Sequence, residues 1–497
     1  MATESTSATS NYKDTLKGTS LFGGVQIYKI VISVLRSKVL AIFLGPVGVG
    51  VLGLLNSTID FIYGLTNLGL NTSAVREISI ANKESNQTRL SYIVAVFKKL
   101  VWITGILGFA ICLFLSPFWS KTSFNNFDYT LAYAILSLAV LSRLLSEGQN
   151  TLLQGTHNLR LMAKSNVWGN TFGLLLVVPI YYFWGISGIA PALLLTYIVN
   201  LLVSWYYSNK VKIQKIFVPL KESLREGRSM VKLGALVALS GLLSTGISYL
   251  IRIYIGNKGG LSDVGLFTAG FAIVNTYVGM VFTAMATEYF PRLSSISNDS
   301  KAFNLALNQQ MQICILLIAP LICAFLVFSK IAVIILYSNE FLGIEKMILF
   351  AIFAIVFKAP SWCCSYAILA KGDSTLFFWT EFASMIVMLV LNIGLYALLG
   401  LDGLGLAYVI LYLYYLIQEW IVCTKRYGIS LDKGVVKTYL PHFFLCGACL
   451  IVVLTCHNMI VRYCLGSLLI CIDLLVAYKD LNSKVNIKEW LLFRKNK

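Results

Sequence analysis

The sequence has very little charge and almost no histidine for its length. Only 12% of its 497 residues are Asp, Glu, Lys or Arg and only three are His, whereas 58% are hydrophobic. Soluble domains carry about a quarter charged residues, so a water-soluble fold could not cover this much apolar surface. The composition therefore argues against a soluble enzyme and indicates a protein embedded in lipid.

Signals for covalent chemistry are also missing. The 11 cysteines lie mostly inside apolar runs without metal-ligand spacing, so we expect packing residues rather than disulfides or metal ligands. The sequence has no phosphate-binding loop and no nucleophile beside a base. The glycine-rich stretch from Gly45 to Gly50 lies between two apolar runs, which predicts a tight turn rather than a dinucleotide site. We therefore expect a protein that is not an enzyme and uses no cofactor or metal.

Apolar windows long enough to cross a bilayer recur along the whole chain. About 20 apolar residues cross the hydrocarbon as a helix, and windows of that length predict fourteen transmembrane helices. Residues 1–20 are polar and lack the apolar core of a signal peptide, so the first span is expected to stay in the mature protein. The predicted spans are 20–44, 47–70, 92–115, 130–153, 165–184, 187–207, 232–254, 264–289, 311–335, 345–369, 376–399, 402–423, 438–456 and 460–478.

Basic residues are divided unevenly between the two sides of these spans. With both termini in the cytoplasm, most of the 40 Lys and Arg residues fall on the cytoplasmic side. This is the positive-inside pattern, so the net charge of +18 reports topology and requires no nucleic-acid partner. The far-side loops are short, which argues against a membrane-embedded glycan polymerase or ligase. Their basic residues are Lys121, Lys258, Lys330, Lys346 and Arg462.

An internal repeat becomes visible when the chain is shifted against itself so that Gly185 falls on Gly400. The same shift places Tyr197 on Tyr412. It moves the first span onto the seventh, so the halves form parallel repeats. We expect an all-α integral membrane protein with two six-helix lobes around a central cavity and a C-terminal helix pair. The expected parts are a cytoplasmic tail (1–19), an N-lobe (20–207), a basic cytoplasmic linker (208–231), a C-lobe (232–424), two additional helices (425–479) and a basic cytoplasmic tail (480–497).

Basic side chains inside the predicted spans are the candidates for substrate binding. Charge within a bilayer costs about 3 kcal/mol or more and often marks a polar cavity. The repeat places Arg143 on Lys358 and, with one residue of slippage, Arg36 on Arg252. Facing lobes would present these residues and Lys29 to one electropositive cavity that suits an anionic substrate. For Lys29 and Arg252, the alternative is that the side chain reaches the lipid headgroups.

Four acidic residues in or beside the spans are candidates for ion coupling. Asp60, Glu147, Glu288 and Glu381 could each carry a proton or bind sodium, so an H⁺ or Na⁺ gradient or the membrane potential could drive the protein. A structural ion pair is the alternative. Glu147, for example, lies four residues after Arg143 on the same helix face.

Several stretches resemble a known family. LGPVGVGVLGLL and TNLGLNTSAVREIS lie within residues 44–79, and their echo DVGLF...YFPRLS lies in the second half. LLQGTHNLRLMAKSNVWGN and ILAKGDSTLFFWTEF follow the fourth and tenth spans. These stretches are similar to the polysaccharide and O-antigen flippases (Wzx type) of the multidrug/oligosaccharidyl-lipid/polysaccharide (MOP) exporter superfamily. The resemblance covers nearly the whole chain.

The resemblance implies a function and its partners. Such a protein, in the bacterial inner membrane, would move an undecaprenyl-diphosphate-linked oligosaccharide from the cytoplasmic to the periplasmic leaflet by alternating access. A polysaccharide polymerase and a chain-length regulator would be its candidate partners. A lipid II flippase and a cation-drug antiporter (MATE type) of the same superfamily remain alternatives. The antiporter predicts an acidic rather than a basic cavity.

Overall fold

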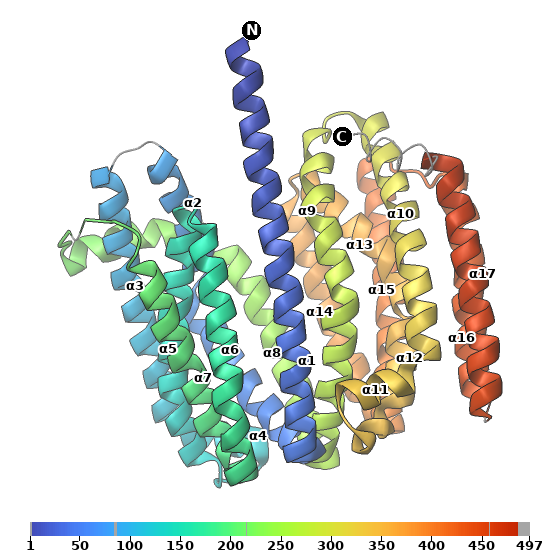
Figure 1. Ribbon diagram of the computed structural model, residues 1–497, viewed down its shortest axis with the longest axis horizontal. Coiled ribbons are helices and arrows are strands. Elements are labelled where there is room, and N and C mark those ends of the chain that lie inside the picture. The colour runs from blue at the N-terminus through green and yellow to red at the C-terminus, as the bar shows by residue number, and fades with distance from the viewer. Residues whose placement is uncertain (1, 84–86, 215, 457, 486–497) are drawn as a thin grey trace. The chain divides into compact units, whose positions relative to one another are not determined.

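The chain folds into helices. The computed structural model describes residues 2–83, 87–214, 216–456 and 458–485, nearly all of them helical, and these residues contain no strand (Figure 1). The expected all-α class is therefore confirmed. The helices form two compact units, Met1–Gly265 and Leu266–Lys497.

The helices follow one another through short connections. The first unit contains α1 (Ala2–Asn67), α2 (Leu70–Lys83), α3 (Gln87–Phe114), α4 (Ser116–Phe124), α5 (Thr130–Gly155), α6 (Leu159–Trp184), the 3₁₀ helix η1 (Gly185–Gly188), α7 (Ile189–Ser208) and most of α8 (Leu220–Ala272). The second unit contains the π-helix η2 (Ile273–Val278), α9 (Gly279–Ser295), α10 (Ser300–Val327), α11 (Ser329–Leu336), the 3₁₀ helix η3 (Asn339–Ile344), α12 (Glu345–Phe353), α13 (Ile355–Ala370), α14 (Ser374–Leu399), α15 (Leu401–Tyr427), α16 (Lys433–Thr455) and α17 (Met459–Val485).

The long apolar helices match the fourteen predicted spans. Within the described residues, 10 helical segments are long and apolar enough to cross a membrane. Three of them, Ile30–Asn67, Leu159–Ser208 and Ala238–Thr283, overlap two predicted spans each, and the shorter apolar helix Ile355–Ala370 overlaps the remaining one, 345–369. A helix satisfies its backbone hydrogen bonds internally, as the hydrocarbon requires. The chain is a multi-pass membrane protein.

Glycines at matching positions break two long helices into pairs of spans. α1 bends at Gly45 (φ 60°, ψ −169°), and α8 bends at Gly260 (φ 84°, ψ 177°), which is the repeat mate of Gly45. Glycine adopts these angles at little cost, because it has no Cβ atom. The tight turn predicted from Gly45 is therefore present, and its repeat mate has the same form.

Other turns recur at the same spacing. Left-handed backbone conformations occur at His157 (φ 56°) and Gly372 (φ 80°), and again at Gly185 (φ 52°) and Gly400 (φ 60°). The first pair precedes α6 and α14, and the second pair ends those helices. Because one and the same shift relates the members of each pair, the backbone confirms the repeat that the sequence predicted.

The first unit is tied together where α1 crosses α8. A Cβ atom on Gly50 would collide with the carbonyl oxygen of Leu261, and one on Gly265 would collide with the carbonyl oxygen of Pro46. The repeat relates Gly50 to Gly265 and Pro46 to Leu261, so the crossing is symmetric. Close backbone approach through small residues is a common way for membrane helices to associate.

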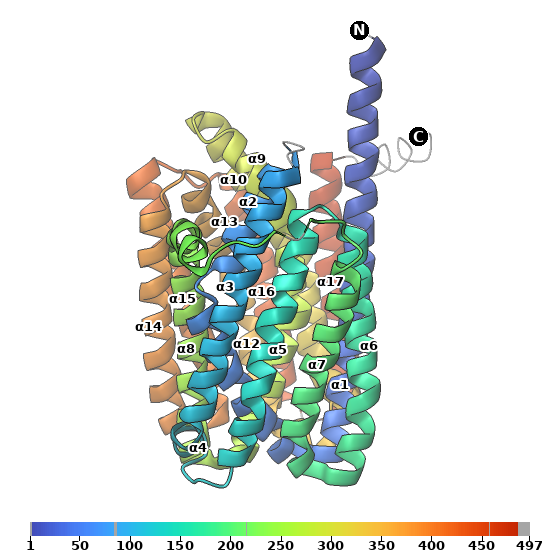
Figure 2. The same ribbon diagram turned by 90° about the vertical axis from the view of Figure 1, so that its left-hand side faces the viewer.

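The remaining helices of the first unit pack in the same manner. α5 contacts α3 and α7, and α6 lies against α7 (Figures 1 and 2). A Cβ atom on Gly108 of α3 would approach Val140 of α5 at 3.0 Å, and one on Gly148 of α5 would approach Val101 of α3 at 2.9 Å. Small residues thus allow these helices to pack closely, which matters in lipid because no hydrophobic effect drives helices together there.

The stretch between α7 and α8 lies against α3. Val218 is buried, and Lys99 of α3 donates a hydrogen bond to its carbonyl oxygen at 2.6 Å. The predicted linker, residues 208–231, thus includes both this stretch and the first turns of α8, which begins at Leu220. The predicted lobe boundaries stay predictions.

In the second unit, α10 holds the C-terminal helix pair. It contacts α13, α16 and α17, while α15 lies against α12, α13 and α14. Arg462 of α17 pairs with Glu345 of α12 at 2.6 Å and donates to Ser329 at 3.1 Å. These contacts attach the pair at the end where α16 turns into α17.

We expect Gly50→Ala to lower the free energy of unfolding by about 1–3 kcal/mol, because the added methyl group would overpack the crossing of α1 and α8. The thermal unfolding midpoint of the purified protein in detergent measures the effect. Gly447→Ala in α16 is the matched control, since a Cβ atom there meets nothing within 4 Å. Equal midpoints for the two variants would contradict close packing at Gly50.

Candidate functional site

Arg36 is a largely buried cation without a counter-ion among the described residues. Its Nε and Nη2 atoms are shielded from solvent and have no hydrogen-bond partner. A Cβ atom on Gly173 of α6 would lie 3.4 Å from Nη2, so this glycine leaves room for the guanidinium. Burying a charge without a partner is costly. The site therefore favours an anion that could accept hydrogen bonds from Arg36.

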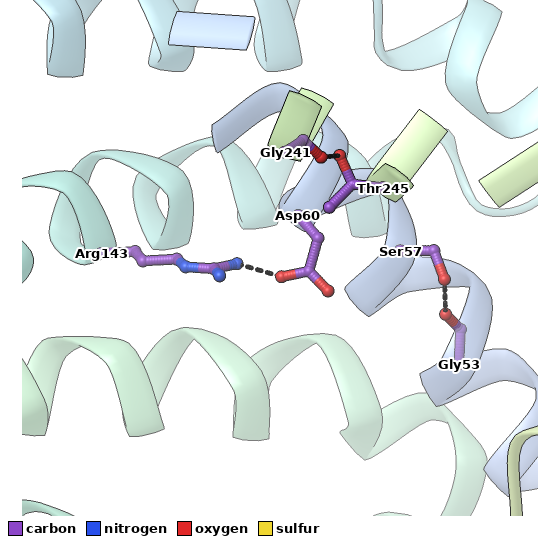
Figure 3. Close-up of polar contacts among 6 residues, drawn as sticks. All are labelled: Gly53, Ser57, Asp60, Arg143, Gly241 and Thr245. Carbon is purple, nitrogen blue, oxygen red and sulfur yellow. Dashed lines mark hydrogen bonds and ion pairs between the residues drawn. The ribbon is translucent and has the colours of Figure 1, made fainter. Parts of the chain in front are cut away.

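Arg143 of α5 forms an ion pair with Asp60 of α1. Its Nη1 atom lies 2.5 Å from Asp60 Oδ1 (Figure 3). The guanidinium also lies over the ring of Tyr63, 4.4 Å from its centroid. The sequence left a pair between Arg143 and Glu147 open, and the structure instead joins Arg143 to a residue of another helix. Glu147 is exposed on α5 and interacts electrostatically with Tyr63.

The Asp60 side chain is 45% exposed, while that of Arg143 is 22% exposed. Thr245 of α8 lies nearby, with its hydroxyl bonded to the Gly241 carbonyl oxygen at 3.0 Å (Figure 3). A Cβ atom on Gly64, one turn after Asp60, would lie 3.5 Å from the Thr245 hydroxyl. The Asp60 carboxylate is thus more accessible than the guanidinium of Arg143, which is largely covered.

Tyr197 of α7 connects the two arginines. Its ring centroid lies 5.8 Å from the guanidinium carbon of Arg143, and its hydroxyl interacts electrostatically with Arg36, Arg143 and Asp60. Three predicted site residues, two from α1 and one from α5, thus interact with one tyrosine. Sequence reasoning used Tyr197 only as a repeat marker, although its recurrence at Tyr412 was the signal that could have identified it.

Arg252 and Lys29 are not placed by the described contacts in the group around Tyr197. Arg252 of α8 donates from Nη1 to the Ser248 hydroxyl at 2.7 Å and to the Ser248 carbonyl oxygen at 3.2 Å. Its guanidinium is thus held against its own helix. The Lys29 side chain lies outside the described residues, so its assignment stays a prediction.

Lys358 of α13 occupies the corresponding place in the second unit. Its ammonium lies 5.1 Å from the ring centroid of Tyr412 and 5.4 Å from that of Phe282. Tyr412 is the repeat mate of Tyr197, so a cation beside this tyrosine recurs in both units. Within the described chain, no carboxylate lies within salt-bridge distance of Lys358, and position 275, the repeat mate of Asp60, is Asn.

Glu381 belongs to a polar cluster of α13, α14 and α15. Its Oε1 atom accepts hydrogen bonds from Tyr415 and, at 3.4 Å, from Ser365. It also interacts electrostatically with Lys358. Glu419 of α15 is fully buried, and its Oε2 atom has no hydrogen-bond partner. Sequence reasoning missed Glu419, although its place inside the predicted span 402–423 marked it.

Glu288 differs from the other acidic candidates. It is exposed near the end of α9 and pairs with Arg292 four residues later, at 3.0 Å. Arg292 also donates to Gln310 of α10 at 2.9 Å. This geometry is typical of a local surface ion pair.

The combined arrangement suits binding and conformational exchange. The described residues contain no group of three or more His, Cys, Asp or Glu side chains placed to hold a metal ion. The first unit instead offers Arg36, which has no counter-ion among these residues, and Arg143, whose partner Asp60 is 45% exposed, and both arginines interact electrostatically with Tyr197. A diphosphate could bind both, because guanidinium groups match phosphate oxygens in geometry and charge.

Comparison with known proteins identifies related sequences and folds. A family model described as "Polysaccharide biosynthesis protein" matches residues 39–346. No curated protein matches the chain in sequence.

Solved structures share the fold at low identity. An inward-facing multidrug resistance MATE family transporter of the MOP superfamily has a TM-score of 0.70 at 15% identity, covering 83% of this chain and 96% of that one. The lipid II flippase MurJ, in an inward closed conformation, has a TM-score of 0.68 at 14% identity, covering 94% and 99%. A MOP superfamily transporter from Pyrococcus furiosus has a TM-score of 0.59 at 16% identity, covering 83% and 96%. The expected superfamily fold is confirmed.

The pairing of Asp60 with Arg143 can be measured by a double-mutant cycle. We expect Asp60→Ala and Arg143→Ala to be coupled by about 1 kcal/mol, because each single change leaves the other charge without its partner. The thermal unfolding midpoints of the two single variants and the double variant in detergent measure this coupling. Glu147→Ala with Arg143→Ala is the matched control on one helix face. Additive effects of Asp60→Ala and Arg143→Ala would contradict the pairing.

Proposed function

The chain belongs to the family of polysaccharide biosynthesis proteins, and we propose that it flips undecaprenyl-diphosphate-linked oligosaccharide from the cytoplasmic to the periplasmic leaflet of the bacterial inner membrane. The cargo is an O-antigen or another surface polysaccharide unit. Both termini are cytoplasmic in this proposal. The observation that carries it is the largely buried, unpaired Arg36, which interacts electrostatically with Tyr197, as Arg143 also does.

The diphosphate is the part of the cargo that these residues recognise. Arg36 and Arg143 bind its oxygens in the first half, and Lys358 binds in the second, while Arg252 and Lys29 add positive charge. Tyr197 and Tyr412 offer aromatic faces beside these cations. The polyprenyl chain stays in the lipid, since its burial in protein is unnecessary for recognition.

Asp60 competes with the diphosphate for Arg143. With the substrate absent, the ion pair neutralises Arg143. When the diphosphate arrives, or when Asp60 takes up a proton, the guanidinium becomes available. The two halves then exchange between cytoplasmic-open and periplasmic-open states, because substrate and ion bind these states with different affinities.

A proton or sodium gradient, or the membrane potential, drives this exchange. Asp60 and Glu381 are the leading coupling residues, since each connects to a basic residue of the site. Glu147 is a further candidate on α5. Glu288 ranks last, because it forms a surface pair with Arg292. A polysaccharide polymerase and a chain-length regulator would act on the cargo afterwards.

The other functions within the fold receive less support. A MATE-type antiporter for cationic drugs would need an acidic site, whereas the Arg36 and Arg143 cluster is basic. The MurJ structure covers 94% of this chain, compared with 83% for the MATE transporter, a difference close in size to the α16–α17 hairpin. The longer match to MurJ favours a lipid-linked cargo. Lipid II is therefore the second candidate.

We expect Arg143→Ala combined with Lys358→Ala to reduce glycan export at least about tenfold, since two cations that contact the diphosphate are removed. Export is measured by complementing a deletion strain and quantifying surface polysaccharide and lipid-linked oligosaccharide on each face of the membrane. The matched control is Arg160→Ala with Lys425→Ala, which removes one exposed cation from each half.

Unchanged export by Arg143→Ala/Lys358→Ala at equal protein levels would show that these cations do not bind the cargo. Normal lipid-linked oligosaccharide in the deletion strain, with altered sensitivity to cationic drugs, would support the antiporter instead.

Ion coupling is tested with the purified protein in liposomes. We expect Glu381→Gln to abolish stimulation of transport by an imposed proton gradient, because the amide cannot exchange a proton, while substrate still binds. Transport of a short-chain lipid-linked oligosaccharide is compared with and without the gradient. Glu340→Gln, at an exposed position, is the control and keeps the stimulation. Full stimulation in Glu381→Gln would exclude this residue from coupling.

A further inference from the structure

A second polar site lies in the C-terminal helix pair, within the second unit. His442 of α16 and Asp473 of α17 have side chains that are 1% and 0% exposed. His442 Nδ1 lies 2.5 Å from Asp473 Oδ1. The remaining polar atoms of both groups, His442 Nε2 and Asp473 Oδ2, are buried and have no hydrogen-bond partner. Each side chain thus satisfies only one of its polar atoms.

The groups that face this pair are uncharged. Cys323 of α10 and Cys446 of α16 are buried close by with their sulfur atoms 3.6 Å apart, and Cys323 and Cys449 both interact electrostatically with Asp473. Tyr439 of α16, whose buried hydroxyl has no partner, lines a small cavity together with His442.

The rest of the surroundings is apolar. The other cavity walls come from α10 and α13 and are entirely hydrophobic. Phe443, the neighbour of His442, packs against Phe353 of α12 and Phe357 of α13. Lys358 follows on α13, but its ammonium lies over Phe282 and Tyr412. In the described part of the chain, no Lys or Arg lies within salt-bridge distance of Asp473.

The charge of the pair depends on one proton. A neutral imidazole beside an ionised Asp473 leaves a net charge of −1 in apolar surroundings, which is costly. Adding one proton to the ring forms an N–H bond and brings the net charge to zero, as an imidazolium facing a carboxylate. Each of the two states leaves a polar atom unsatisfied, so the site is not locked into one of them by hydrogen bonding.

A polar stripe leads from the pair toward the end of the hairpin. Thr438 lies one turn before His442 on α16, and its hydroxyl donates to Asp480 of α17 at 2.6 Å. Asp480 lies two turns after Asp473, and it is partly exposed. Residues spaced in this way share one helix face. The α16–α17 interface thus carries a second polar contact between the His442–Asp473 pair and the open end of the hairpin.

We propose that the His442–Asp473 pair is a proton-binding site, which takes up and releases one H⁺ within the C-terminal helix pair. The inference stands on this cluster alone and does not depend on the proposed cargo. A proton is the ligand that fits, since the pair offers only two ligand atoms and no metal-holding group of three occurs among the described residues. Histidine is the side chain best suited to exchange a proton near neutral pH.

The proton can be observed directly by NMR. The sequence has three histidines, His157, His442 and His457, so ¹⁵N-histidine labelling of the full chain in lipid nanodiscs gives a simple spectrum. His442→Gln identifies the signals of His442. We expect these ring signals to shift through one transition between about pH 5 and pH 9. In Asp473→Asn, we expect the titration midpoint of His442 to fall by at least about one pH unit, because the imidazolium loses its counter-ion.

Tyr439→Phe is the matched control. It removes a neighbouring unpaired hydroxyl but keeps the pair, so its midpoint should equal that of the wild type. Ring signals that stay constant over the whole range in the wild type would mean that the pair only holds α16 against α17. An unchanged midpoint in Asp473→Asn would also overturn the proposal. If that variant fails to fold, the wild-type titration still decides between exchange and a fixed structural pair.

Discussion

The cost of an unpaired charge in hydrocarbon governs where the polar side chains of this protein lie. Lipid provides no hydrogen-bond partners and little screening, so each buried ionisable group must find a partner or serve a function. Asp60 meets Arg143, Glu345 meets Arg462, and Asp473 meets His442, in each case between two different helices. These pairs connect helices that apolar packing alone would orient only loosely. Arg36 has no such partner among the described residues, and this is why we propose it for the binding site.

The two repeats solve the same electrostatic problem differently. Both place a cation beside the same tyrosine, Arg143 at Tyr197 and Lys358 at Tyr412. Only the first pairs its cation with a carboxylate on another helix, Asp60, whose mate in the second is Asn275. An aromatic face attracts a cation but does not neutralise it. An anionic cargo would therefore find Lys358 without an ion pair among the described residues, whereas Arg143 is paired with Asp60. Protonation of Asp60 would then change the affinity for the cargo.

Uptake of a proton would have a different consequence in each of the three polar regions. At Asp60 it would release a cation for the cargo, whereas at Glu381 it would alter a cluster that includes Tyr415 and the buried Glu419. The helices that carry His442 and Asp473 pack against α10, which holds none of the candidate basic residues. A proton there would change the charge of the hairpin itself. The proposed mechanism thus combines a basic recognition site with several buried groups that would carry charge.

The sequence by itself determined the number of spans, the repeat and the presence of buried basic residues. These features depend on hydropathy over single helices and on a constant spacing between repeat mates, both of which are properties of the linear chain. The turn at Gly45 was predictable for the same reason, since its conformation is local. The partners of the charges were decided only by the tertiary structure. Spacing along α5 allowed Arg143 to pair with Glu147, yet the packing of α1 against α5 brings Asp60 to it instead. Likewise, nothing local joins His442 to Asp473, because which helix faces meet depends on side-chain packing across the whole unit.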